Sequence, residues 1–144
     1  MISPGDRTHR AVSYAACAWA ALFGTPHLWW ALGIRAGFPG GDSSYEFFMN
    51  SWWRVLFNWT VIALSLLAIV ITLQLLRPPQ QVRHRWIPRT LAWIASALLL
   101  IRGVAGHIVD GTSDLVWAPA FTVGGILLGG VAWMSAQPWP RKTI

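Results

Sequence analysis

Residues 101–110, IRGVAGHIVD, interrupt an apolar run that begins at Leu91. The ten residues from Leu91 to Leu100 are apolar or small, and Arg102, His107 and Asp110 then follow within nine positions. Charged and polar side chains are costly in a lipid-facing helix, so each of them needs a partner, a water-filled cavity or a function. The stretch therefore predicts a membrane helix that forms part of a site.

The composition favours a membrane protein of one domain. Of its 144 residues, 55% are hydrophobic and 11% are charged, whereas soluble domains carry about 25% charged residues. The net charge of +6 raises the question of a nucleic-acid partner. However, the basic residues lie beside apolar runs, which membrane topology explains better, and we expect no nucleic acid. Cys17 is the single cysteine, which excludes an internal disulfide and a Cys-x-x-Cys redox pair.

Four segments reach the roughly 20 residues that cross a bilayer. They cover residues 11–34, 52–76, 91–109 and 118–137. The first continues to Ile34, so we expect a retained transmembrane helix and not a cleaved signal. Pro26 within it predicts a kink or a free backbone carbonyl. The predicted fold is an all-α membrane protein, a bundle of four transmembrane helices formed by a single domain over residues 1–144.

The arginines predict the orientation of this bundle. Four alternating helices place eight basic residues on the side of both termini: Arg7, Arg10, Arg77, Arg83, Arg85, Arg89, Arg141 and Lys142. Only Arg35 and Arg54 flank the helices on the other side, so the positive-inside rule predicts that both termini are cytoplasmic. Ten of the eleven basic residues are arginine, a weak sign of a GC-rich bacterial genome. We therefore expect an integral protein of the bacterial cytoplasmic membrane.

The first outer loop, residues 35–51, predicts a short interfacial segment. Asp42 or Ser43 is expected to begin a short helix, with Glu46 in its first turn. Packing in the membrane interface is the favoured interpretation, and a lid over an outer cavity is the alternative. Five tryptophans at the outer helix ends are typical of an aromatic belt and also offer the wall of a pocket: Trp29, Trp30, Trp52, Trp53 and Trp117.

Small residues predict close helix packing. Gly125-x-x-x-Gly129 in the last segment permits the near approach of another helix. Packing within the chain is the favoured interpretation, and a homo-oligomer through Gly125 and Gly129 is left open.

Three motifs carry a resemblance to a known family. They are His27-Leu28-Trp29-Trp30-Ala31-Leu32-Gly33, Arg102-Gly103-x-x-Gly106 and Trp117-Ala118-Pro119-Ala120-Phe121-x-x-Gly124-Gly125. The chain resembles, over nearly its whole length, an uncharacterised bacterial family of small four-helix integral membrane proteins, a domain of unknown function. The resemblance implies the four-helix fold and implies no activity.

Polar residues converge on the outer half of the predicted bundle. At about 1.5 Å per helical residue, His27, Asn58, Arg102 and His107 lie at comparable depths. Asp110 follows His107 by three residues and shares its helix face. Each of these groups also has a structural interpretation: an ion pair for Arg102 and an interhelical contact for Asn58. Together they favour a functional cavity over a purely structural network.

The leading hypothesis is a membrane-embedded enzyme that performs cyclisation, isomerisation or epoxide opening on a lipophilic substrate. Its acid, base and anion-stabilising groups would be Glu46, Asp110, His107 and Arg102. The expected substrate-binding residues are His27, Trp30, Trp53, Arg54, Asn58 and Trp117. This hypothesis needs no cofactor and no metal.

Two alternatives belong to other functional classes. The first is a binding, transport or accessory subunit for a lipid or small molecule. A path through the membrane is disfavoured because the inner half offers only a few modest polar residues, Ser13, Ser65, Gln74 and Ser96. The second is a haem or metal protein with His27 and His107 as ligands, which no recognised binding motif supports.

Overall fold

The computed structural model describes residues 4–77, 84–109 and 116–137. Within them the chain forms five helices and no strand: α1 (Pro4–Ala31), α2 (Gly41–Met49), α3 (Trp52–Leu76), α4 (Trp86–Val109) and α5 (Trp117–Ala136). Three of these, α3, α4 and α5, are long and apolar enough to cross a membrane. The all-helical, membrane-type architecture is therefore confirmed, with three candidate spans where the sequence predicted four. The difference is α1, in which polar first turns, Pro26 and His27 lower the mean hydropathy.

The helix ends follow local sequence signals. The observed α3 has the predicted bounds, whereas α1 and α4 begin at Pro4 and Trp86, earlier than the apolar pattern indicated. The helix α1 continues through Pro26 and ends at Ala31. Just beyond this end, Gly33 has a left-handed φ of 88°, and the Ile34 amide donates to the Trp29 carbonyl over 2.9 Å. This is a Schellman end, which requires a residue such as glycine that tolerates a positive φ.

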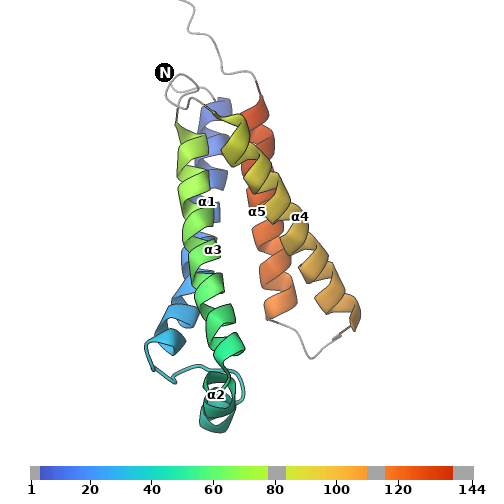
Figure 1. Cartoon of the computed structure of the whole chain (residues 1–144). Coiled ribbons are helices and arrows are strands. Elements are labelled where there is room, and N and C mark those ends of the chain that lie inside the picture. The colour runs from blue at the N-terminus through green and yellow to red at the C-terminus, as the bar shows by residue number, and fades with distance from the viewer. Residues whose placement is uncertain (1–3, 78–83, 110–115, 138–144) are drawn as a thin grey trace, which may run out of the picture.

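The four long helices form two pairs. Figure 1 shows α1 lying along α3 and α4 lying along α5, while α1 also contacts α5. Contacts between α3 and α4 are much sparser, and α4 moves away from α3 towards the end of the bundle that carries α2. The two pairs are therefore close at one end and separated at the other.

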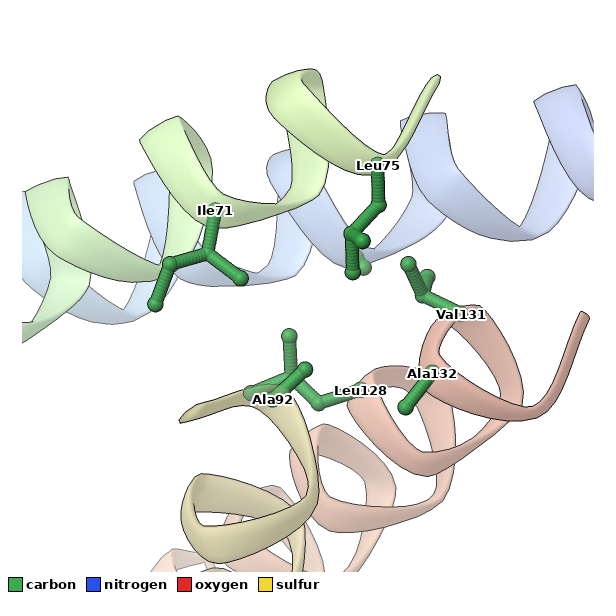
Figure 2. Close-up of a cluster of buried hydrophobic side chains, with 7 residues drawn as sticks. Ile71, Leu75, Ala92, Leu128, Val131 and Ala132 are labelled. Carbon is green, nitrogen blue, oxygen red and sulfur yellow. The ribbon is translucent and has the colours of Figure 1, made fainter. Parts of the chain in front are cut away.

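The hydrophobic core lies at the close end. Its buried members come from all four long helices: Ala16, Ile71, Leu75, Ala92, Leu128, Val131 and Ala132. Figure 2 shows Ile71 and Leu75 of α3 facing Val131 and Leu128 of α5. Three of the seven are alanines, which let the helix backbones approach each other, and branched aliphatic side chains fill the remaining space.

Glycines set the packing of α5. A side-chain carbon added to Gly125 would lie 2.7 Å from Leu100 Cγ, and one added to Gly129 would lie 2.8 Å from Ser96 Oγ. The Ser96 hydroxyl also donates to the Gly125 carbonyl over 2.7 Å. The glycine face is thus occupied by α4 of the same chain. A homo-oligomer through Gly125 and Gly129 would have to displace α4.

Gly124 provides a test of this packing, because a methyl group there would overlap the Trp19 ring. Trp19 donates from Nε1 to the Ala120 carbonyl over 3.0 Å, so the ring cannot turn away without losing that bond. We expect Gly124→Ala to destabilise the protein by about 1–3 kcal/mol, the usual cost of overpacking. Thermal unfolding in detergent would measure it.

Gly130→Ala is the matched control, since its added carbon would lie 3.3 Å from Val12 Cγ1, which a small shift accommodates. Equal unfolding temperatures for the two variants would contradict the proposed role of the Gly124–Trp19 contact.

Candidate functional site

A cavity of about 380 Å³ lies between the two helix pairs at their separated end. Seven aromatic side chains line it, and they come from α1, the loop after it, α2, α3 and α5: Phe23, Trp30, Phe38, Phe48, Phe57, Trp117 and Phe121. The other lining residues are His27, Pro39, Asn58, Val61 and Arg102. The volume is within the roughly 300–1,000 Å³ of small-molecule sites. The cavity is thus an apolar chamber with three polar side chains.

His27 and Asn58 form a buried pair between α1 and α3. The Asn58 amide nitrogen donates to the His27 backbone carbonyl over 2.9 Å, and Asn58 Oδ1 lies 2.8 Å from His27 Nδ1. The exposed fractions are 1% for Asn58 and 9% for His27, so both hydrogen bonds are sheltered. Asn58 therefore holds the histidine by its backbone and by its ring, and fixes how the imidazole is turned.

The rings around His27 form a continuous aromatic shell. The centroid of the imidazole lies 5.1 Å from that of Trp30, 5.6 Å from that of Phe23 and 5.9 Å from that of Trp117. Phe121 extends the shell, with its centroid 5.3 Å from that of Phe23. These separations are typical of tilted and edge-to-face aromatic pairs. The imidazole therefore lies among aromatic rings where it lines the cavity.

Arg102 lines the cavity from α4. Its guanidinium carbon lies 5.3 Å from the centroid of Phe121, a cation–π distance. Its side chain is exposed, so its charge lies towards the edge of the cavity and not in its depth. A guanidinium can only donate hydrogen bonds, whereas a neutral imidazole also accepts one. The cavity therefore has polar groups of two different kinds.

The first outer loop and α2 cover the α2 end of the cavity. Phe38, Pro39 and Phe48 line it, and the Phe38 ring centroid lies 4.9 Å from that of Trp30. The Tyr45 hydroxyl donates to the Trp30 carbonyl over 3.0 Å and fastens α2 to the end of α1. The helix begins at Gly41 after Gly40, whose φ is 84°, so neither Asp42 nor Ser43 caps it as the sequence predicted. The observed contacts are those of a cover over the cavity.

Five sequence-predicted residues line the same cavity: His27, Trp30, Asn58, Arg102 and Trp117. Glu46 is not among them. Its carboxylate accepts a hydrogen bond from Arg35 Nη1 over 2.9 Å, and its side chain is 65% exposed. The prediction that Glu46 reaches the polar cluster is therefore wrong, because Tyr45, its neighbour, occupies the inward face of α2 and turns Glu46 outward.

Arg54 and Trp53 also lie away from the cavity lining. The Arg54 guanidinium carbon lies 4.2 Å from the centroid of Phe47 and 5.1 Å from that of Trp53. Arg54 Nη1 donates to the Phe47 carbonyl over 3.4 Å, so this arginine ties α3 to α2. Trp53 is 54% exposed. Both residues belong to the outside of the bundle end.

His107 is exposed on the last turn of α4 and is not part of the cavity lining. The expected meeting of His107 with His27 therefore does not occur in the cavity, because α4 presents Arg102 to it and turns His107 elsewhere. Among the described residues, no group of three or more His, Cys, Asp or Glu side chains is placed to hold a metal ion. Asp110 lies outside the described residues.

Sequence reasoning assigned none of the five phenylalanines of the cavity to the site. Phe23 precedes His27 by four residues, and Phe121 follows Trp117 by four, so each shares a helix face with a residue that was predicted. That spacing is a usable signal. Phe38 and Phe48 offer no such signal, since their positions depend on how the loop and α2 fold back.

The end of the bundle opposite to the cavity is basic. Arg85 donates to the carbonyls of Leu75 and Arg77 at the end of α3, and Arg89 donates to the Ser135 carbonyl at the end of α5. Cations near helix C-termini are favourable because the last carbonyls lack helical partners. Partial burial lowers the pKa of Arg85, and the nearby charge of Arg89 lowers it further.

Comparison with known proteins returned no match: no protein-family model, curated protein or solved structure resembles the chain closely enough to be aligned with it. The resemblance to a family of small four-helix membrane proteins therefore stays a prediction. A functional assignment rests on the geometry of the cavity.

The His27–Asn58 contact can be measured by a double-mutant cycle with His27→Phe and Asn58→Leu. Because His27→Phe keeps the backbone carbonyl that Asn58 also binds, the coupling isolates the hydrogen bond between the two side chains. We expect a coupling free energy of about 0.6–1.7 kcal/mol, the range of interhelical hydrogen bonds in membrane proteins. Reversible unfolding in mixed detergent micelles would give it.

A coupling free energy indistinguishable from zero would contradict the hydrogen bond between the His27 and Asn58 side chains. Phe57→Leu paired with Asn58→Leu serves as the control cycle, since no hydrogen bond joins those two side chains in the structure.

Proposed function

We propose that this chain is an integral membrane protein that binds a lipophilic small molecule in the cavity between its two helix pairs. The observation that carries the proposal is the pairing of His27 with Asn58 inside an aromatic chamber of about 380 Å³. An apolar site with a few fixed polar groups is the usual form of a small-molecule pocket. The rings supply affinity for an apolar body, and His27 with Arg102 supplies orientation.

The position of the cavity mouth supports a ligand that arrives from the membrane. Phe57 of α3 and Arg102 of α4 line the cavity and are also exposed at the surface, where these two helices diverge. Phe57 lies five residues into α3, and Arg102 lies seven residues before the end of α4. At about 1.5 Å per residue, both are roughly 8–10 Å inside the helix ends, at the depth of lipid acyl chains.

The proposal includes a fourth membrane span. The helix α1 contacts its neighbours from one end of the bundle to the other: Val12 lies near Gly130, Gly24 near Ser65, and His27 near Asn58. A helix packed along two apolar spans, α3 and α5, from one end to the other is expected to cross the bilayer with them. We place the arginine-rich end, which holds the start of α1, on the cytoplasmic side, following the positive-inside rule.

Acid–base turnover of the bound molecule is a second proposal, which the position of His27 favours. His27 is the one histidine on the cavity lining, and no carboxyl group of the described residues lines the cavity with it. A proton would therefore be exchanged with His27, and Glu46 would have no part in the reaction. Cyclisation or isomerisation of a lipophilic substrate is the reaction class that a single base in an apolar chamber suits.

Filling the cavity tests the binding proposal. Val61→Phe places a larger side chain at the cavity wall, and we expect it to weaken binding of 4-dodecylphenol, a single-ring lipophile, by tenfold or more. Val70→Phe is the matched control, because Val70 is on the same helix and 49% exposed away from the lining. Tryptophan fluorescence of protein in lipid nanodiscs would report binding. Equal affinities in both variants would contradict the proposal.

Site-specific labelling tests the orientation. In a Cys17→Ser background, Ser43→Cys lies on exposed α2 and His84→Cys lies at the arginine-rich end. A membrane-impermeant maleimide is expected to label Ser43→Cys in intact cells and His84→Cys only after permeabilisation. The reverse pattern would overturn the assigned sidedness.

A further inference from the structure

The hydrogen bonds of Asn58 determine which nitrogen of His27 carries the proton. A carbonyl oxygen can only accept, so the Asn58 atom that faces the His27 backbone carbonyl at 2.9 Å has to be the amide nitrogen. The amide oxygen of Asn58 then faces the imidazole, 2.8 Å from Nδ1. Because that oxygen can only accept, Nδ1 has to be the donor. The neutral imidazole is therefore protonated at Nδ1 and bears a lone pair at Nε2.

That lone pair has no hydrogen-bond donor among the described residues. The histidine contacts the rings of Phe23, Trp30 and Trp117, and the indole nitrogen of Trp30 already donates to the Ala36 carbonyl over 3.3 Å. The amide nitrogen of Asn58 already donates to the His27 carbonyl, and its amide oxygen is bonded to His27 Nδ1. His27 lines the cavity, so a ligand that fills the space beside Nε2 without donating a hydrogen bond would leave this acceptor buried and unsatisfied, which is costly.

We propose that His27 makes the cavity selective for lipophilic molecules that carry a hydroxyl group, with the O–H donating to Nε2. This inference rests on the proposed binding function and names the class of ligand: an apolar ring or chain ending in a phenol or an alcohol. A ketone, a quinone carbonyl or an ether in the same place would bring its oxygen, which can only accept, beside Nε2, which is also an acceptor. Such a ligand would bury two unsatisfied groups in place of one hydrogen bond.

The arrangement of the pair explains why a neutral donor is favoured over an anion at this position. A carboxylate or phosphate has no hydrogen to give to Nε2, and the aromatic shell offers it no other charge in the depth of the cavity. Arg102 is the cation on the lining, and its side chain is exposed at the mouth. The hydroxyl end of a ligand would therefore lie deep, beside His27, and any acceptor further along the ligand would lie towards Arg102.

Two ligands that differ only by a methyl group on oxygen test this inference. We expect the full-length protein in nanodiscs to bind 4-dodecylphenol about 10- to 100-fold more tightly than 4-dodecylanisole, the preference expected when one buried hydrogen bond is lost. Geranylgeraniol and its methyl ether form a second pair, and the larger of the two ratios identifies a phenol or an alcohol as the natural head group.

His27→Phe keeps an aromatic ring in the shell and removes the acceptor, so the preference is expected to fall to about onefold. His107→Phe makes the same exchange at an exposed position outside the lining and is expected to keep the wild-type ratio. A ratio that survives in His27→Phe would overturn the assignment to His27. The ratio in the wild-type protein is decisive even if that variant does not fold.

The imidazole proton gives an independent readout. Nitrogen-15 spectra of histidine-labelled protein are expected to show His27 protonated at Nδ1, the opposite of the tautomer that predominates in free neutral histidine. Protonation at Nε2 would overturn the inference. Equal binding of the phenol and the anisole would also overturn it, while leaving the proposed binding function intact. Failure of both to bind would overturn that function as well.

Discussion

Asn58 holds α1 against α3 at two atoms of one residue, the backbone carbonyl and the ring of His27. In a hydrocarbon surrounding, hydrogen bonds across a helix interface have no water to compete with them, so they orient helices that apolar packing alone would leave free to rotate. This contact lies at the separated end of the bundle, away from the hydrophobic core. Together with the close approach of Gly24 to Ser65, it fixes the register of α1 against α3 and so the position of the α1 rings in the cavity.

The cavity follows from an unequal distribution of side-chain size along the helices. Alanine and glycine lie where the four long helices meet, and they allow α4 and α5 to approach α1 and α3 closely. Phenylalanine and tryptophan lie at the other end, where Trp30 and Trp117 have ring centroids 6.4 Å apart. Large rings of this kind hold the helix pairs apart without filling the space between them. The resulting chamber is closed at its end by α2, which Tyr45 fastens to Trp30.

Particular residues show how far a sequence can predict such a site. His27, Asn58 and Arg102 were singled out because polar groups are rare in apolar helices, and that argument is independent of packing. His107 was singled out by the same argument and Glu46 as an acid in the outer loop, yet Glu46 pairs with Arg35 on the outside and His107 is exposed. Near a helix end a polar side chain can reach water, so its presence there says little about which way it faces. The depth of these residues in the membrane predicted that their side chains meet. The rotation of each helix about its axis determined which of them do.

The sequence by itself determined the helical, membrane-type architecture, because apolar runs of about 20 residues leave the backbone no other way to satisfy its hydrogen bonds in lipid. It also determined which polar residues require a partner. Only the tertiary structure decided that His27 is paired with Asn58, that Arg102 and not His107 faces the cavity, and that α2 covers it. The physical reason is that these outcomes depend on helix rotation and separation. Those are set by contacts between residues far apart in the chain, such as Gly124 with Trp19.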